Sequence, residues 1–70
     1  MREYILNTVN TLRMEKGITQ EELAEKIQVS RQTIIAIEKG NYTPSVLLAL
    51  KISKFFDMPL EQIFKMTYEK

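Results

Sequence analysis

Three neighbouring side chains in the segment Ser30–Gly40 carry groups that can read the edges of DNA bases. Arginine can donate two hydrogen bonds to guanine, glutamine can make a bidentate contact to adenine, and an apolar side chain can touch the methyl group of thymine. Arg31, Gln32 and Ile35 supply these three chemistries within a few residues of one another. The segment could therefore recognise bases if a single exposed surface presents all three.

Helical spacing places these residues away from the core. Ile34 and Ile37 are three residues apart, as expected for side chains on the buried side of a helix. With the core direction midway between them, the far side of the helix carries Gln32, Ile35, Ala36 and Lys39. Ser30 and Arg31 lie at the tip of the helix. We predict base contacts from Arg31, Gln32, Ile35 and Ala36.

A simpler interpretation of this surface stays open. Gln32 and Lys39 could be an ordinary solvated face. Ile35 could fill a gap in the core, or pack against the 41–43 loop or a partner subunit. An exposed isoleucine between arginine and glutamine is nevertheless unusual for a solvated face, which favours the base-reading interpretation.

Polar groups around this helix could contact the DNA backbone. Gln20 stands at the start of a predicted helix, where backbone N–H groups and the positive helix end attract phosphate. Gln20 could instead be an ordinary surface residue that contacts no phosphate. Residues 41–43, just after the third helix, could likewise form only a capping turn. The acidic Glu21, Glu22 and Glu25 should face away from the duplex. We predict phosphate contacts from Gln20, Ser30, Lys39, Asn41, Tyr42 and Thr43.

Turn signals divide the chain into segments of helix length. Glycines, prolines and the polar turn at residues 28–30 separate runs of about 8 to 15 residues, longer than most strands. We predict five helices. The first ends at Lys16 before Gly17, the second is capped by Thr19 and reaches Ile27, and the third runs from Ser30 to Gly40. The fourth begins after Pro44 and Ser45 and reaches Phe56, and the fifth runs from Leu60 to Phe64. The short turn at 28–30 forces its two helices to cross steeply, so that the second projects where it can enter a major groove.

Apolar positions predict the buried side of each helix. The predicted inward residues are Val9, Leu12 and Met14; Leu23, Ala24 and Ile27; Ile34 and Ile37; Val46, Leu47, Ala49, Leu50, Ile52 and Phe56; and Leu60, Ile63 and Phe64. The fourth helix is the most apolar and is therefore expected to be the most buried. Arg13 and Glu38 are placed for a structural ion pair between the first and third helices.

The two ends of the chain have a different pattern. REYIL and FKMTY alternate polar with apolar or aromatic residues, which is typical of two short paired strands. A longer first helix and a frayed tail are the alternatives.

Composition narrows the class of protein. Seventy residues make one small domain, which buries only about 60% of its unfolded surface, so self-association is expected to add stability. A net charge of +1 neither requires nor excludes a nucleic-acid partner. The chain has no His and no Cys, and its carboxylates converge on no predicted cleft, so we predict no enzyme, no catalytic residue, no metal and no cofactor. No secretion signal or membrane span is recognisable, which predicts a cytoplasmic protein.

The run from Thr19 to Phe64 resembles the Cro/C1-type helix-turn-helix family of bacterial and phage repressors. The stretches VSRQTI, IEKGNYTPS, LALKI and PLEQIF are especially similar to its small single-domain members, such as the cytolysin repressor. The resemblance extends from about Ile5 to Lys65. It therefore includes the predicted fourth and fifth helices as well as the two-helix motif.

The resemblance implies a five-helix domain that binds palindromic operators as a homodimer through its C-terminal helix region. Gln20 and Ser30 match phosphate-contacting positions, Arg31, Gln32 and Ala36 match positions that face bases, and Arg13 and Glu38 match an internal ion pair. The smallest members pair their termini in a two-stranded sheet. Two departures stand out: Gln28 replaces the usual Gly at a turn position of positive φ, at a cost of roughly 1 kcal/mol, and Ile35 replaces a polar residue.

We therefore predict a mainly α protein with one domain, residues 1–70, and a short antiparallel terminal sheet. Its expected function is a sequence-specific regulator that binds double-stranded DNA, most simply a repressor acting as a homodimer on a palindromic operator. The alternative is an antitoxin or co-regulator that uses the same fold to hold another protein. No membrane partner and no small-molecule effector is expected.

Overall fold

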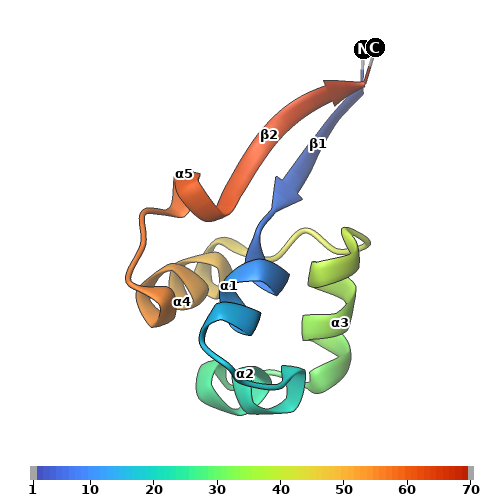
Figure 1. Cartoon of the computed structure of the whole chain (residues 1–70). Coiled ribbons are helices and arrows are strands. Elements are labelled where there is room, and N and C mark those ends of the chain that lie inside the picture. The colour runs from blue at the N-terminus through green and yellow to red at the C-terminus, as the bar shows by residue number, and fades with distance from the viewer. Residues whose placement is uncertain (1, 70) are drawn as a thin grey trace.

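The computed structural model describes residues 2–69, in which five helices lie between two terminal strands (Figure 1). In chain order the elements are β1 (Arg2–Asn7), α1 (Val9–Glu15), α2 (Gln20–Ile27), α3 (Arg31–Lys39), α4 (Val46–Phe56), α5 (Leu60–Ile63) and β2 (Phe64–Glu69). The helices form a body from which the sheet projects. This arrangement confirms the predicted fold class.

Local hydrogen bonds set the helix boundaries where the sequence predicts them. The Thr19 hydroxyl accepts from the Glu22 N–H at 3.0 Å, and the Glu22 carboxylate accepts from the Thr19 N–H at 2.8 Å. This reciprocal capping box satisfies two backbone donors at the start of α2. Gly17 and Gly40 follow the ends of α1 and α3 at φ +69° and +80°, where a side chain would be strained.

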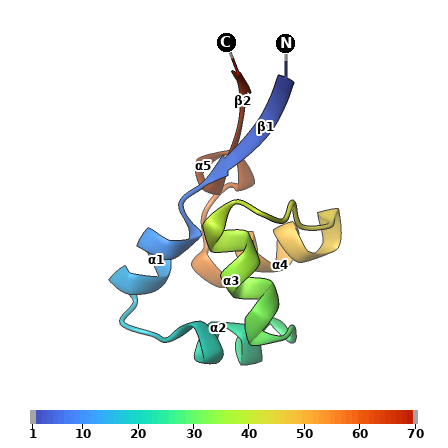
Figure 2. The same ribbon diagram turned by 90° about the vertical axis from the view of Figure 1, so that its right-hand side faces the viewer.

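The turn between α2 and α3 has the conformation that the family resemblance implies. Gln28 adopts φ +62° and ψ +50°, in the left-handed region usually left to glycine. The Val29 N–H donates to the Ala24 carbonyl at 2.9 Å and closes the turn. Because so few residues join the helices, α2 crosses the lower end of α3 (Figure 2).

The terminal strands pair as predicted. β1 and β2 are antiparallel, with Glu3 opposite Tyr68 and Ile5 opposite Met66. The Thr8 N–H donates to the Ile63 carbonyl at 3.0 Å just beyond the strands and ties the sheet to the helical body. The predicted fifth helix is one residue too long, because Phe64 has an extended backbone and begins β2.

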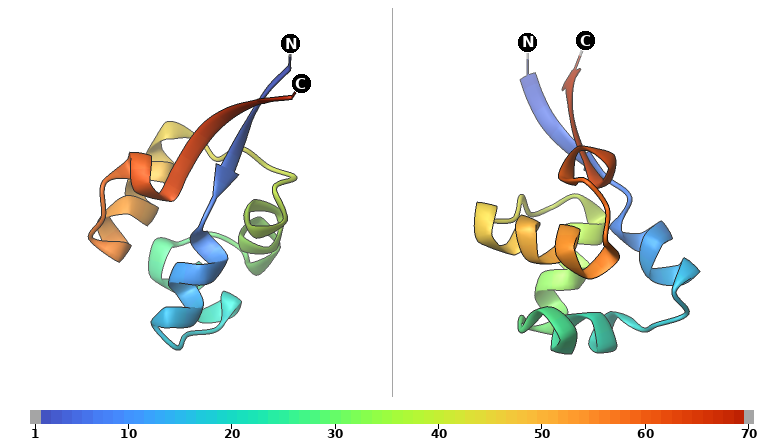
Figure 3. Two further views of the ribbon diagram at one scale, coloured as in Figure 1. Left: turned by 45° about the horizontal axis from the view of Figure 1, so that its top comes forward. Right: turned by 90° about the vertical axis from the view of Figure 1, so that its left-hand side faces the viewer.

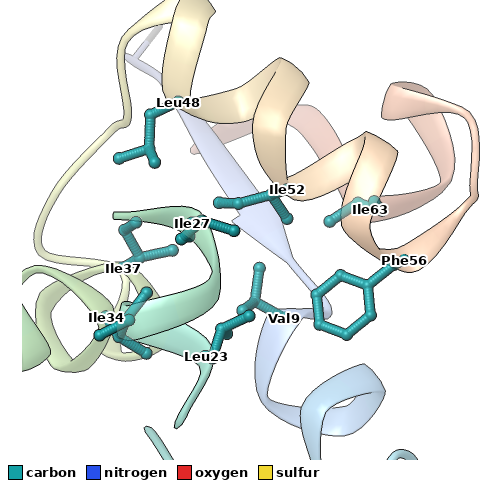
Figure 4. Close-up of a cluster of buried hydrophobic side chains, with 10 residues drawn as sticks. Val9, Leu23, Ile27, Ile34, Ile37, Leu48, Ile52, Phe56 and Ile63 are labelled. Carbon is teal, nitrogen blue, oxygen red and sulfur yellow. The ribbon is translucent and has the colours of Figure 1, made fainter. Parts of the chain in front are cut away.

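All five helices of the described chain contribute to one core (Figure 4). Its fully buried large side chains are Val9 from α1, Leu23 from α2, Ile34 and Ile37 from α3, Ile52 from α4 and Ile63 from α5. Ala24, Ile27, Leu48 and Phe56 complete the cluster. Ile34 and Ile37 therefore hold α3 to the body as predicted, which leaves its other side free to face outwards.

The predicted buried side of α4 was correct for Ala49, Ile52 and Phe56 and wrong for Val46, Leu47 and Leu50. Val46, Leu47 and Leu50 are 75%, 67% and 52% exposed, whereas Leu48, which was not predicted, is 7% exposed and lies in the core. α4 is apolar on nearly every side, so periodicity cannot identify its inner face; its packing against α2 decides the orientation. Met14 was also wrongly predicted to face inward and is exposed.

Candidate nucleic-acid interface

Ser30 caps the start of α3, the helix predicted to contact DNA bases. Its hydroxyl oxygen accepts from the Thr33 N–H at 3.2 Å and caps the first turn of α3. The same hydroxyl lies 3.0 Å from the Thr33 hydroxyl, so one hydrogen bond joins the two side chains. Capping is thus the role that the structure shows for Ser30. Its phosphate contact remains a prediction.

The side of α3 that faces away from the core carries the residues predicted to read bases. Arg31, Gln32 and Lys39 are exposed, and Ile35 and Ala36 are half-buried. Ile35 belongs neither to the core nor to the partly buried hydrophobic side chains that the structure shows packed against it. The geometry therefore does not support the interpretation in which Ile35 fills a core gap. It leaves an aliphatic side chain between a guanidinium and an amide on one surface.

A concave polar site of about 470 Å³ lies between the beginnings of α2 and α3. It brings together Gln20 and Arg31, two residues predicted to contact DNA, with the structural Arg13. The remaining lining residues are Gly17, Ile18, Thr19 and Glu21. The guanidinium of Arg31 and the positive end of α2 could attract a phosphate to this concavity, opposed by the carboxylate of Glu21; the charge of Arg13 is already paired with Glu38.

Glu38, on α3, joins that helix to α1 and α2. Its carboxylate accepts from Arg13 Nε at 2.7 Å and Nη2 at 3.2 Å, which confirms the predicted ion pair. Asn10 Nδ2 donates to it at 3.0 Å and Gln20 Nε2 at 3.1 Å. The side chain of Glu38 is only 5% exposed and that of Arg13 13%. Gln20 is thus held by Glu38 through one amide hydrogen, and its phosphate contact would use the other.

Ionised Glu38 is favoured despite its burial. Burial of the carboxyl group would raise the pKa of Glu38, but hydrogen bonds from Arg13, Asn10 and Gln20 and the positive charge of Arg13 together hold that pKa below its ordinary value. At neutral pH the Glu38 carboxylate is therefore charged, and in this form it accepts the hydrogen bonds from α1 and α2.

Acid should remove the stability that ionised Glu38 contributes. Because its folded-state pKa lies below the ordinary 4.5, this contribution is complete above that value and is lost as the pH falls through the folded pKa. Urea unfolding should show the free energy of unfolding falling more steeply with acidification in the wild type than in Glu38→Gln, which cannot titrate. Parallel curves for the two proteins would contradict a lowered pKa.

The loop after α3 presents exposed polar groups next to the helix that carries the predicted base contacts. The Asn41 N–H donates to the Ala36 carbonyl at 2.9 Å and completes the end of α3. The side chains of Asn41, Tyr42 and Thr43 are exposed. The structure therefore places them next to the end of α3, where their predicted phosphate contacts could be made.

Sequence reasoning did not find Asn7 and Asn10. Asn7 Nδ2 donates to the Ile37 carbonyl at 2.9 Å, and Asn7 Oδ1 accepts from the Val9 N–H at 3.1 Å. Asn7 thereby joins β1, α1 and the last turn of α3. An asparagine two residues before a predicted helix is a known signal for the second contact, whereas the first contact depends on the tertiary fold.

A family model described as helix-turn-helix matches residues 9–63, the region from α1 to α5. The chain belongs to the Cro/C1-type helix-turn-helix family. As a member of this family it is a helix-turn-helix transcriptional regulator. β1 and β2 lie entirely outside the matched region.

Similar proteins carry consistent names. The uncharacterized helix-turn-helix-type transcriptional regulator MJ0272 of Methanocaldococcus jannaschii is 57% identical over 83% of this chain and 88% of its own length. The cryptic phage CTXphi transcriptional repressor RstR of Vibrio cholerae is 34% identical over 79% of this chain and 50% of the repressor. The crystal structure of the restriction-modification controller protein C.AhdI from Aeromonas hydrophila matches with a TM-score of 0.71 and 28% identity, over 77% of this chain and 82% of that one. Among the described residues, no helix has the length and apolar character needed to cross a membrane.

Proposed function

We propose that this regulator is a repressor that binds a palindromic operator in double-stranded DNA as a homodimer, with α3 in the major groove. One observation carries the proposal: α3 is anchored by the fully buried Ile34 and Ile37 and turns an arginine, a glutamine and an isoleucine outwards. The predicted base contacts are Arg31, Gln32, Ile35 and Ala36. The predicted phosphate contacts are Gln20, Ser30, Lys39, Asn41, Tyr42 and Thr43.

An exposed apolar face on α4 supports a second copy as partner. Val46, Leu47 and Leu50 are all more than half exposed, which is unusual for adjacent large apolar side chains on a small monomer. Beside them lies an apolar groove of about 170 Å³, lined by Ile5, Thr43, Pro44, Val46, Ala49, Leu60 and Phe64. Figure 3 shows α5 between α4 and the projecting sheet. A homodimer through this face would bury the groove and present two α3 helices.

The apolar face also suits the antitoxin or co-regulator alternative, in which a different protein covers it. Selection of bound sites from random double-stranded DNA, with the protein-to-DNA stoichiometry measured on the enriched sites, separates the two functions. A repressor dimer should enrich inverted half-sites about one helical turn apart, near 34 Å, with two chains bound. Failure to enrich any sequence, or affinity that does not fall with salt, would contradict operator binding, because each phosphate contact contributes about −0.9 to the log–log salt slope.

Gln32→Ala should weaken binding to the selected operator by about 1–3 kcal/mol and relax the preference at one base pair. The side chain is exposed on the outer face of α3, so its loss removes a base contact and not a core contact. Fluorescence anisotropy on the operator and on random duplex measures both effects. An equal loss on the two DNAs would contradict direct base reading by Gln32.

Ile35→Ala should weaken operator binding, and the weakening should shrink when the contacted thymine is replaced by uracil. The reason is that uracil lacks the methyl group that an apolar side chain contacts in the major groove. Titrations of both proteins against thymine and uracil operators provide the measurement. A defect of the same size on both operators would instead indicate contact with sugar atoms or with the 41–43 loop.

A further inference from the structure

Three lysines line a cleft between the end of α2 and the second half of α4. This lysine cleft has a volume of about 270 Å³ and is lined by Lys26, Ile27, Gln28, Lys51, Lys54 and Phe55. No carboxylate lines it. Among the side chains of residues 3–68 the structure shows an ion pair only between Arg13 and Glu38, so none of their carboxylates lies within ion-pair distance of these ammonium groups. The cleft therefore brings three lysine side chains and no carboxylate to one concave surface.

Phe55 forms a fixed apolar wall of the cleft. It is half-buried and packs against the core. Its ring meets Phe56 edge to face at a centroid distance of 5.1 Å. Lys16 Nζ lies 5.3 Å from the Phe55 ring centroid, so a fourth ammonium group stands close to the same ring. Because Phe55 already packs against Phe56 and Lys16, its side chain loses little further conformational freedom when a partner binds to its exposed area.

Local structure explains only part of this charge. Lys26 and Lys54 lie in the last turns of α2 and α4, where cations interact favourably with the helix dipole. Lys51 lies in the middle of α4 and has no such role. Like charges that converge on a concave surface repel one another, and an anionic partner would relieve that repulsion.

The cleft is separate from both surfaces already described. α4 lies on the other side of the body from α3 (Figures 1 and 3). The lining residues of the cleft include neither the α3 residues predicted to read bases nor Val46, Leu47 and Leu50. An occupant of the cleft could therefore be bound while α3 is in a DNA groove.

We propose that the lysine cleft binds an acidic segment of a partner protein, one in which aspartates and glutamates surround an apolar or aromatic side chain. Ammonium groups on flexible stems can each meet a carboxylate, while Phe55 and the lysine stems receive the apolar side chain. A continuous phosphate backbone fits less well, because it is charged at every nucleotide and would extend over the neighbouring concavity that Glu22 and Glu25 line, whereas a short acidic segment can end within the cleft. This inference goes beyond operator binding and does not depend on it.

A labelled oligoglutamate peptide with one central phenylalanine tests the proposal by fluorescence anisotropy on the full chain. The peptide should bind saturably, and Lys54→Glu and Lys26→Glu should each weaken binding about fivefold or more. Lys65→Glu on β2 is the matched control, because it changes the charge equally and is also exposed, as are Lys26 and Lys54. The control should bind the peptide and melt like the wild type.

Several outcomes would overturn the proposal. Absence of saturable binding would do so, as would equal weakening by Lys65→Glu, which would indicate unspecific charge attraction. Tighter binding of a single-stranded oligonucleotide with the same dependence on Lys54 would assign the cleft to nucleic acid. Loss of operator binding in Lys54→Glu, with Lys65→Glu unaffected, would place the cleft in the DNA interface and leave the proposed function standing. Unchanged operator affinity in Lys54→Glu is the expected result.

Discussion

Replacing Arg13 by alanine should lower the free energy of unfolding by about 3–5 kcal/mol at neutral pH, the range for removing one partner of a buried ion pair. The carboxylate of Glu38 would stay buried and lose two of its four hydrogen bonds. Arg13 Nη1 would also stop donating to the Ile18 carbonyl, a bond of 2.9 Å. A domain of this size has only about 4–10 kcal/mol of stability, so the variant should be close to unfolding.

Chemical denaturation of the wild type and three variants measures this effect. Lys39→Ala, on the exposed side of α3, should change the free energy of unfolding by no more than about 0.5 kcal/mol. Arg13→Met combined with Glu38→Leu should recover much of the loss, because neither charge is then buried alone. A cost below about 1 kcal/mol for Arg13→Ala would place the pair among surface ion pairs and contradict its structural role.

Leu50→Glu should convert the proposed dimer into a monomer and lower operator affinity by roughly a hundredfold, because the second half-site contact is no longer linked to the first. Leu50 is 52% exposed and outside the core, so the isolated fold should tolerate the change. A carboxylate on the apolar face of α4, in contrast, would be desolvated by a partner subunit. This prediction depends on the proposed homodimer.

Sedimentation of the protein and titration of operator and half-site DNA test the two parts separately. Thr11→Glu is the matched control, since Thr11 is exposed on α1 and gains the same charge. Leu50→Glu should bind a single half-site as the wild-type monomer does. A Leu50→Glu protein that stays dimeric would place the dimer contact on another surface, while a monomer with undiminished operator affinity would contradict cooperative use of two half-sites.

Predictions that depend on neighbouring residues could be made from the sequence. The capping box of Thr19 and Glu22, the cap of Ser30 and the positive φ of Gly17 and Gly40 involve groups within about one helical turn. Such signals act before any tertiary contact exists, which explains their reliability.

The resemblance to a family extended these predictions to long-range contacts. The ion pair between Arg13 and Glu38 and the pairing of the two terminal strands join residues far apart in the chain. Helical spacing made the ion pair plausible, and alternating polarity made the strands plausible. Neither pattern identifies its partner, so the comparison with known folds supplied the rest.

The sequence by itself determined where α2 and α3 begin and the outward position of Arg31 and Gln32. Only the tertiary structure decided that Leu48 enters the core from α4 while Val46, Leu47 and Leu50 stay exposed, because apolar residues stand on more than one side of this helix and their spacing does not choose between them. The tertiary structure also decided that Gln20 and Asn10 share the carboxylate of Glu38. Helix caps depend on hydrogen bonds between residues close together in the chain, so the sequence predicts them. The burial of a side chain and the sharing of the Glu38 carboxylate depend on which helices pack together.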